Sequence, residues 1–392
     1  MNHDAELILI AGGLLTAGVA ASLLATRLRL PALVLFLGLG LAIGTDGLGW
    51  ISFDDYELAR LIGSIALLLI LFEGGLSAGL PSIRPVLRSA VSLAIVATTI
   101  TALVAGLAAS LLFDLSAKEG LLLGVILSAT DGAAVFALMR GEQIPRRLAR
   151  TLEAEAGLND PVAVLLVLSM IKIIQRSSYD AVDSGLFFAH ELLVGLAVGG
   201  AVGWLALRLL NRTDAVDSAL TLVASLAAAA VAFGAATLLS GSGFLAVYVT
   251  GLVLGGASIE RRPGLRAFHQ GLSQVAEIAL FLALGLLVFP SQLGDVAVKG
   301  ILLALVIAFV ARPVAVAVAT LWSGFTVKER VVLSWAGLRG AIPVVLATLA
   351  VIAGVPRSLH FFNIVFFAVI VSTVLQGSTV GWLVRRLELV RA

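Results

Sequence analysis

The feature that most constrains this chain is a succession of apolar runs, each about 20 residues long. As an α-helix, a run of that length spans a hydrocarbon core of about 30 Å, and within lipid only helices or closed barrels satisfy every backbone polar group. Of the 392 residues, 60% are hydrophobic and 13% are charged, and the mean hydropathy is +1.09. A water-soluble domain needs far less apolar surface. The sequence therefore predicts an all-α polytopic membrane protein.

Thirteen apolar runs are predicted to cross the membrane. They lie near residues 5–25, 31–46, 58–77, 89–113, 119–138, 149–174, 186–207, 218–239, 243–258, 271–289, 297–320, 330–353 and 361–383. We expect one transmembrane domain over 1–392, with a first repeat near 5–174, a linker helix near 186–207 and a second repeat near 218–387. The chain opens with MNHDAE, which lacks the basic leader of a cleaved signal peptide, so the first run is expected to be a true span. The absence of cysteine excludes disulfides and thiolate metal sites.

Basic residues alternate between loops. One set of loops carries most of them, including Arg27, Arg84, Arg88, Arg146, Arg147, Arg150, Arg208, Arg261, Arg262, Lys328, Arg330, Arg385 and Arg386. The opposite loops carry Lys118, Lys172, Arg176, Lys299 and Arg357, together with the acidic stretch TDGLGWISFDDYE. By the positive-inside rule, the N-terminus is expected outside and the C-terminus in the cytoplasm, as an odd number of spans requires.

Charged residues inside the apolar runs are few, and each costs about 3 kcal/mol there unless it faces a partner or water. The stretch EAEAGLNDPVAV, residues 153–164, holds several of them. Within it Asp160 follows the amide of Asn159 and precedes Pro161, so a carboxylate, an amide and a missing backbone donor lie together in one span. Such a site can hold a cation. The alternative is a polar seam that only joins helices, although Ser, Thr or Asn usually serve that purpose.

Two spans have the composition of helices that unwind within the membrane. The fifth contains SATDGAAVF and the twelfth contains AGLRGAIP. Interrupted helices expose backbone carbonyls and half-helix ends that can coordinate ions. The residues that these interruptions would place at midspan are Thr130, Asp131, Gly132, Gly337, Arg339 and Gly340. The twelfth span comes seven positions after the fifth, and because this offset is odd the two spans run in opposite directions. This predicts an inverted-topology repeat with spans 1 to 6 matched to spans 8 to 13.

Five motifs, LFEGGL, SATDGAAVF, LEAEAGLNDPVAV, GLRGAIP and STVLQGSTV, resemble those of monovalent cation/proton antiporters of the NhaP and NHE type. The resemblance covers nearly the whole chain. The NDP and TDGAAVF motifs are most similar to the bacterial branch that includes cell-volume-regulation proteins, often assigned as K+/H+ exchangers. The resemblance implies an NhaA-like fold with two inverted six-helix repeats and crossed unwound helices. It also implies a homodimer in the lipid of the bacterial inner membrane, without cofactor, catalytic residue or nucleic-acid partner. Many relatives add a cytoplasmic regulatory domain that is absent from this chain.

The resemblance also implies roles for individual residues. The ion- and proton-binding residues of the family match Asp160, Asn159, Asp131, Thr130 and Glu73, with Asp160 as the carboxylate that binds the ion. The hinges of the unwound helices match Gly132, Gly337 and Gly340.

A buried ion pair of the family matches Glu155 and Arg339. We expect a structural role for this pair, since removal of one partner would leave the other charge alone in a low dielectric. Ala156 stands where the family commonly has Ser, whose hydroxyl can reach the cation.

The expected activity is electroneutral exchange of a monovalent cation, K+ or alternatively Na+, for H+. A proton and a cation exclude one another at a single carboxylate. Asn159 replaces an aspartate of electrogenic relatives, so one titratable group is missing. No P-loop or HExxH motif supports nucleotide hydrolysis or zinc proteolysis. The alternatives are a cation channel or K+ efflux domain, an intramembrane aspartyl hydrolase that uses Asp131 and Asp160, and an organic-anion symporter.

Overall fold

The computed structural model describes residues 2–28, 32–130, 144–175, 181–212, 218–257 and 263–389. Every regular element in these ranges is a helix. Within them, nine helical stretches are long and apolar enough to cross a membrane, and three shorter apolar helices accompany them. The prediction of an all-α, multi-pass membrane protein is thereby confirmed.

The helices follow one another along the chain with short connections. In order they are α1 (Asn2–Leu28), α2 (Ala32–Ile43), α3 (Tyr56–Ala78), α4 (Leu80–Ile83), η1 (Arg84–Val86), α5 (Leu87–Ser92), η2 (Leu93–Ala97), α6 (Thr98–Phe113), α7 (Ala117–Ile126), α9 (Arg146–Gln175), α10 (Ala181–Arg212), α11 (Ser218–Leu238), α12 (Gly243–Ala257), α13 (Pro263–Leu286), η4 (Pro290–Gln292), α14 (Gly294–Val306), η5 (Ile307–Ala311), α15 (Arg312–Ala319), α16 (Val327–Trp335), α17 (Ala341–Ile352), α18 (Ser358–Ser372), η6 (Thr373–Gly377) and α19 (Ser378–Arg386).

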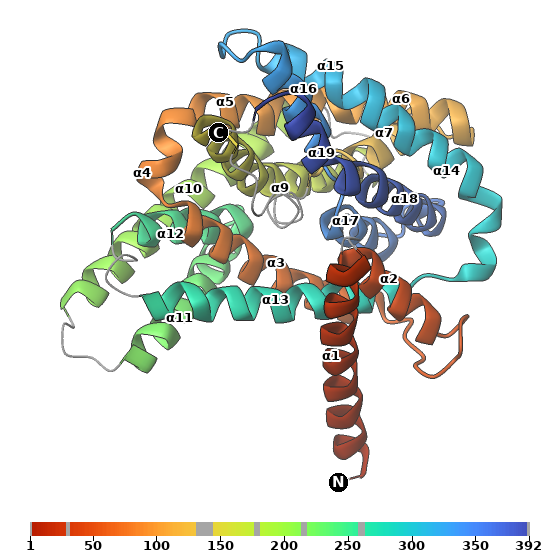
Figure 1. The fold of residues 1–392 in the computed structure, drawn as a ribbon, viewed down its shortest axis with the longest axis horizontal. Coiled ribbons are helices and arrows are strands. Elements are labelled where there is room, and N and C mark those ends of the chain that lie inside the picture. Colours follow the sequence, from red (N-terminus) through yellow and green to blue (C-terminus); the bar gives the residue numbers. More distant parts are fainter. Residues whose placement is uncertain are drawn as a thin grey trace.

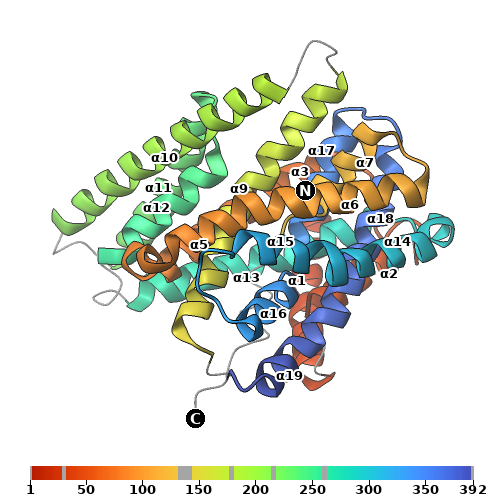
Figure 2. The same cartoon turned by 90° about the horizontal axis from the view of Figure 1, so that it is seen from above.

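One group of helices consists of α1, α2, α3 and α10 to α13 (Figures 1 and 2). In this group α3 lies against α12 and α13, while α10 lies against α11 and α12. The α3–α12 contact is close at the backbone: a Cβ added to Gly75 would lie 2.4 Å from the carbonyl oxygen of Tyr248, and one added to Gly251 would lie 2.6 Å from that of Phe72. Small residues of this kind allow helices to pack tightly in lipid, where no hydrophobic force drives them together.

The second group consists of α5 to α7 and α14 to α19, where α6 lies against α7, α14 against α18, and α15 against η2. Helix α9, which carries the stretch EAEAGLNDP, contacts both groups. It touches α3, α10 and α12 on one side and α5, α7 and α17 on the other. The EAEAGLNDP stretch of α9 therefore lies between the two groups of helices, where a relative movement of the groups would alter its surroundings.

The interruption predicted in the twelfth span is present, because α16 ends at Trp335 and α17 begins only at Ala341. Both α7 and α16 are short, with 10 and 9 residues. Each begins with a capping box, in which Ser116 with Glu119, or Thr326 with Glu329, satisfies backbone donors of the first turn. The expected interruption after α7 involves Asp131 and Gly132, which lie outside the described residues.

Three helical stretches contain a π-helical segment, namely η2, η5 and η6. Segments of this type are frequent at functional sites, because the wider turn re-aims the side chains that follow it. Thr98 directly follows η2 and Arg312 directly follows η5. Both residues prove to contact polar side chains of α9.

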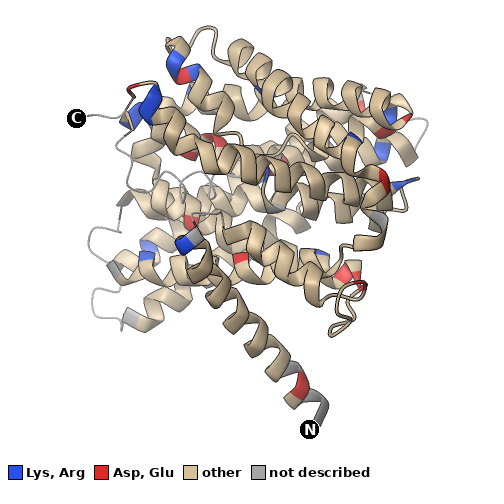
Figure 3. Ribbon diagram, turned by 45° about the vertical axis from the view of Figure 1, so that its right-hand side comes forward, with Lys and Arg blue, Asp and Glu red and all other residues tan. Residues whose placement is uncertain are grey.

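Charged residues are sparse along the helices. In Figure 3 most Lys, Arg, Asp and Glu positions lie near helix ends, toward the margins of the view. The buried charged residues among those that the structure describes include Glu155, Asp160, Arg312 and Arg339.

Candidate functional site

The candidate site is centred on α9, a helix with Pro161 in its interior. Asn159 is fully buried and Asp160 is 7% exposed. Because Pro161 lacks a backbone N–H, the carbonyl oxygen of Gly157 loses its usual intrahelical donor. The predicted combination of carboxylate, amide and interrupted hydrogen bonding therefore lies inside the protein, as the sequence indicated.

The Asn159 amide is held on both sides by threonine hydroxyls. Thr98 of α6 donates to its Oδ1 at 2.9 Å, and its Nδ2 donates to Thr130 Oγ1 at 2.7 Å. All three side chains are buried. Asn159 thus connects α9 to the π-containing fourth span and to the residue that ends the described part of the fifth span. Both polar atoms of the Asn159 amide therefore have hydrogen-bond partners, and its predicted role in ion binding stays a prediction.

Asp131 was predicted to share this site with Thr130. It lies outside the described residues, as does the hinge Gly132, so their predicted roles stay predictions.

Glu73 lies on α3, in the first group of helices, where it is half-buried and accepts a hydrogen bond from Ser77 Oγ at 2.7 Å. Its charge interacts with that of Glu153 on α9, and the charges of Glu153 and Asp160 both act on the Tyr248 hydroxyl. A Cβ on Gly157 would lie 2.1 Å from the Tyr248 ring. Glu73 on α3 and Asp160 on α9 therefore lie on different helices, and Glu153 is the acid of α9 on which the charge of Glu73 acts.

Glu155 and Arg339 were predicted to form a buried ion pair, and the structure gives Glu155 another arginine as its ion-pair partner. Glu155 instead pairs with Arg312 of α15, and these side chains are only 2% and 1% exposed. Arg312 comes first after the π segment η5, and its side chain reaches Glu155 of α9. The carboxylate therefore neutralises a different arginine from the one that the motif comparison indicated.

Arg339 contacts the backbone just after the end of α7. Its Nη1 donates to the carbonyl oxygens of Ser128 and Ala129, at 2.9 and 2.8 Å, just after the end of α7. Its own backbone is held by α18 and η6, because its N–H donates to Ser372 Oγ at 2.9 Å and its carbonyl oxygen accepts from Thr373 at 3.1 Å. A cation at a helix C-terminus is favourable, since the last carbonyls carry partial negative charge.

The two predicted hinges of the twelfth span lie in its interruption. Gly340 directly precedes α17. Gly337 lies against Arg312, and a Cβ there would approach Arg312 Nε to 2.4 Å. The glycine at position 337 thus makes room for the arginine of the ion pair, which is a packing reason for this residue.

Ala156 is half-buried on α9, next to the ion-paired Glu155. Its methyl group offers no oxygen to a cation.

Three residues that contribute to the site were not predicted, namely Thr98, Ser128 and Arg312 as the partner of Glu155. The polar run TTIT at residues 98–101 in an otherwise apolar span was the available signal for Thr98.

The chain is similar to known transporters along nearly its whole length. Residues 13–386 match the family described as sodium/hydrogen exchanger, transmembrane. The K(+)/H(+) antiporter NhaP2 of Shewanella baltica (strain OS223) is 38% identical over 372 residues, and the K(+)/H(+) antiporter NhaP of Alkalimonas amylolytica is 40% identical over 386 residues. These alignments cover 94% and 97% of this chain but only 64% and 67% of the relatives, so the chain spans about two thirds of their length.

A solved structure has the same fold. The sodium proton antiporter MjNhaP1 from Methanocaldococcus jannaschii matches with a TM-score of 0.83 at 26% identity, over 97% of this chain and 99% of that one. The resemblance read from the five motifs is confirmed by both kinds of similarity. The chain belongs to the transmembrane sodium/hydrogen exchanger family.

Proposed function

We propose that this chain exchanges a monovalent cation for protons, with the two competing for Asp160. The observation that carries the proposal is a buried carboxylate on a membrane-crossing helix, next to an amide that is held by Thr98 and Thr130. Its relatives are antiporters by name, which supports transport rather than catalysis. K+ is the favoured cation because both relatives are named K(+)/H(+) antiporters, and Na+ is the alternative.

The geometry limits which groups bind the cation. Arg339 donates hydrogen bonds to the carbonyl oxygens of Ser128 and Ala129, and Arg312 forms an ion pair with Glu155, so these oxygens already have a partner. Candidate ligands are therefore Asp160, the Thr130 hydroxyl and the predicted Asp131. Asn159 donates a hydrogen bond to Thr130, and Glu73 stays a predicted contributor to the ion site.

We further propose alternating access by movement of one helix group against the other, with α9 between them. The matched capping boxes of α7 and α16 and the π segments η2 and η5 support an inverted repeat, since they recur in the predicted repeats 5–174 and 218–387. We also propose that the chain crosses the membrane thirteen times, with its N-terminus outside and its C-terminus in the cytoplasm.

One proton is exchanged for one monovalent cation in this scheme, so the loaded site carries the same charge in both states. Proteoliposomes whose membrane potential is clamped test this point, because the ion gradients at which proton flux vanishes will not depend on the imposed potential. A null point that moves with voltage would require a second proton, and Glu73 or Asp131 would be its carrier.

The exchange itself is tested by fluorescence dequenching in proteoliposomes that carry a pH gradient, with K+, Na+, Li+ and Rb+ added in turn. Asp160→Asn is expected to abolish the response, since it removes the titratable charge and keeps the shape. Asp114→Asn is the matched control, because Asp114 is a helix-capping residue in the left-handed region, which Asn tolerates. Normal exchange by Asp160→Asn would end the proposal, and single-channel currents would favour a channel.

A further inference from the structure

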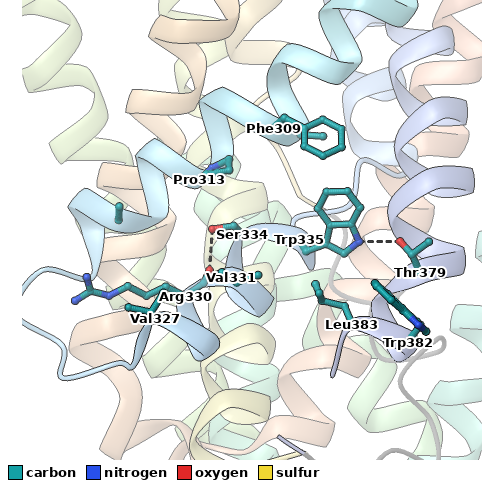
Figure 4. A pocket seen from close by; sticks show the side chains of 12 residues that line it. Phe309, Pro313, Val327, Arg330, Val331, Ser334, Trp335, Thr379, Trp382 and Leu383 are labelled. Carbon is teal, nitrogen blue, oxygen red and sulfur yellow. Dashed lines mark hydrogen bonds between the residues drawn. The ribbon is translucent and has the colours of Figure 1, made fainter. Parts of the chain in front are cut away.

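An open apolar groove lies on the second helix group, between α15, α16 and α19 (Figure 4). Its volume is about 640 Å³. Val331 and Trp335 of α16 form its floor, and Phe309, Ala317 and Leu383 belong to its walls. Phe309 is 56% exposed. In a membrane-crossing chain, an exposed apolar wall of this kind faces lipid.

One end of the groove is charged. Figure 4 shows Arg330 at the opposite end from Phe309 and Trp335. Arg330 Nη2 donates to the carbonyl oxygen of Thr320 at 3.1 Å, which fixes the guanidinium near the loop between α15 and α16. Its Nε is buried and has no hydrogen-bond partner among the residues that the structure describes. The groove is therefore amphipathic, with an unsatisfied donor at its polar end.

The surroundings of the groove favour an anion. Lys328 lies on the same helix as Arg330, and Arg385 and Arg386 lie in the last turn of α19. The two neighbouring acids are engaged, because Glu329 closes the capping box of α16 and Glu388 pairs with Lys328 at 3.5 Å. Since Lys328 and Glu388 offset one another, Arg330 supplies the charge among the lining residues, and Arg385 and Arg386 follow the lining residue Leu383 on α19.

We propose that this groove binds an acyl chain of an anionic phospholipid whose phosphate lies against Arg330. The apolar walls accommodate the acyl chain, and phosphate oxygens accept charge-assisted hydrogen bonds from the guanidinium. Basic residues beside a membrane-crossing segment attract anionic headgroups. Trp382 at the rim is 58% exposed, which suits an indole at the headgroup level.

The groove connects to the interrupted helix by hydrogen bonds. Gln376 Nε2 donates to the carbonyl oxygen of Trp335 at 3.1 Å, Ser372 donates to Gln376 Oε1 at 2.6 Å, and the Arg339 N–H donates to Ser372. A lipid that holds Trp335 in place thus restrains the end of α16 beside the candidate site. Bound anionic lipid is expected to raise the thermal unfolding temperature of the protein.

Tryptophan fluorescence tests the proposal in proteoliposomes of the full chain. Of the five tryptophans, Trp335 alone is kept and the others are changed to Phe. Phosphatidylglycerol or phosphatidylcholine with brominated acyl chains is titrated into a phosphatidylcholine bilayer as the quencher. Quenching of Trp335 is expected at an about fivefold lower fraction of the anionic lipid. Equal quenching by both lipids would overturn the proposal, and no quenching by either would show that protein covers the groove.

Substitutions distinguish the contribution of the Arg330 charge from that of the shape of the groove. Arg330→Gln is expected to remove the preference for the anionic lipid, Arg330→Lys to keep most of it, and Arg84→Gln, at an exposed arginine on η1, to leave it unchanged. Ala317→Phe narrows the groove at an exposed position and is expected to reduce quenching by both lipids. If Arg330→Gln does not fold, Ala317→Phe decides. A preference that survives Arg330→Gln, or unchanged quenching in Ala317→Phe, would contradict the proposed site.

Discussion

Arg312 and Arg339 are both buried, at 1% exposure each, yet their charges are balanced in different ways. Arg312 faces the full negative charge of Glu155. Arg339 faces the carbonyl oxygens of Ser128 and Ala129 just after the end of α7, which supply only partial charges. One arginine forms an ion pair, and the other donates hydrogen bonds to backbone carbonyls after the end of α7.

This difference assigns the acids of α9 to separate tasks. Glu155 is neutralised by Arg312, so we do not propose it as a carboxylate that exchanges a proton for a cation. Asp160, one helical turn and a half further along, is the carboxylate that we propose for exchange. In the proposed function, structural pairing and ion exchange thus depend on different acids of one stretch.

The largest expected effect comes from breaking the ion pair. Glu155→Ala leaves the Arg312 charge alone in the interior, which is expected to lower the free energy of unfolding by about 3–5 kcal/mol. The double variant Glu155→Ala with Arg312→Leu is expected to recover most of that loss, because no charge remains stranded. Thermal unfolding in detergent measures both.

The same measurement distinguishes the two arginines. Glu155→Ala combined with Arg339→Ala is expected to lose at least the sum of the single losses, because these residues do not pair. If stability recovers in that double variant and does not recover with Arg312→Leu, then Arg339 is the ion-pair partner of Glu155. That result would contradict the comparison of the two arginines.

A smaller loss is expected from Gly337→Ala. The new Cβ would lie 2.4 Å from Arg312 Nε, so the ion-paired side chain must shift. Overpacking of this kind costs about 1–3 kcal/mol of unfolding free energy. In an Arg312→Ala background most of this cost is expected to vanish. Gly74→Ala is the matched control on α3, where a Cβ meets nothing within 4 Å, and a loss as large there would exclude the contact with Arg312 as the cause.

Arg339→Lys is expected to cost about 1 kcal/mol, because one ammonium can keep one of the two bonds to the carbonyls of Ser128 and Ala129. The charge is retained, so we expect a slower exchange rate rather than a large loss of stability. Thermal unfolding and proteoliposome exchange are to be measured on the same preparation. A stability loss equal to that of Glu155→Ala would mean that Arg339 also neutralises a carboxylate.

Much of the architecture could be predicted from the sequence, because hydropathy and local motifs are properties of single segments. The apolar spans, the burial of Asn159 and Asp160, and the interruption between α16 and α17 all follow from such signals. The capping boxes are also local, since SAKE and TVKE are readable as helix starts.

The partners across helices could not be predicted in this way. Arg312 and Arg339 both lie in apolar spans, and nothing in their spacing says which one reaches Glu155. Arg312 directly follows the π segment η5, which no sequence signal marks, and only the fold brings it to Glu155. Thr98 was missed for a similar reason, because a threonine in an apolar span is common and only the fold brings it to Asn159.

The smallest expected effect concerns an exposed charge, in contrast to the two buried ones. Asp46, in the loop between α2 and α3, accepts a hydrogen bond from the Ser291 N–H at 2.8 Å, and the hydrogen bonding to Ser291 lowers the pKa of Asp46 below its ordinary 3.8. A carboxyl group whose pKa is lower in the folded state stabilises the fold above its unfolded pKa, and this contribution is lost as the pH falls through the folded pKa. Asp46→Ala is therefore expected to lower the thermal unfolding temperature slightly at pH 7, by less than any substitution above. The difference from the parent is expected to shrink below about pH 4. An offset that stays constant from pH 7 to pH 3 would mean that Asp46 contributes through packing rather than through its charge.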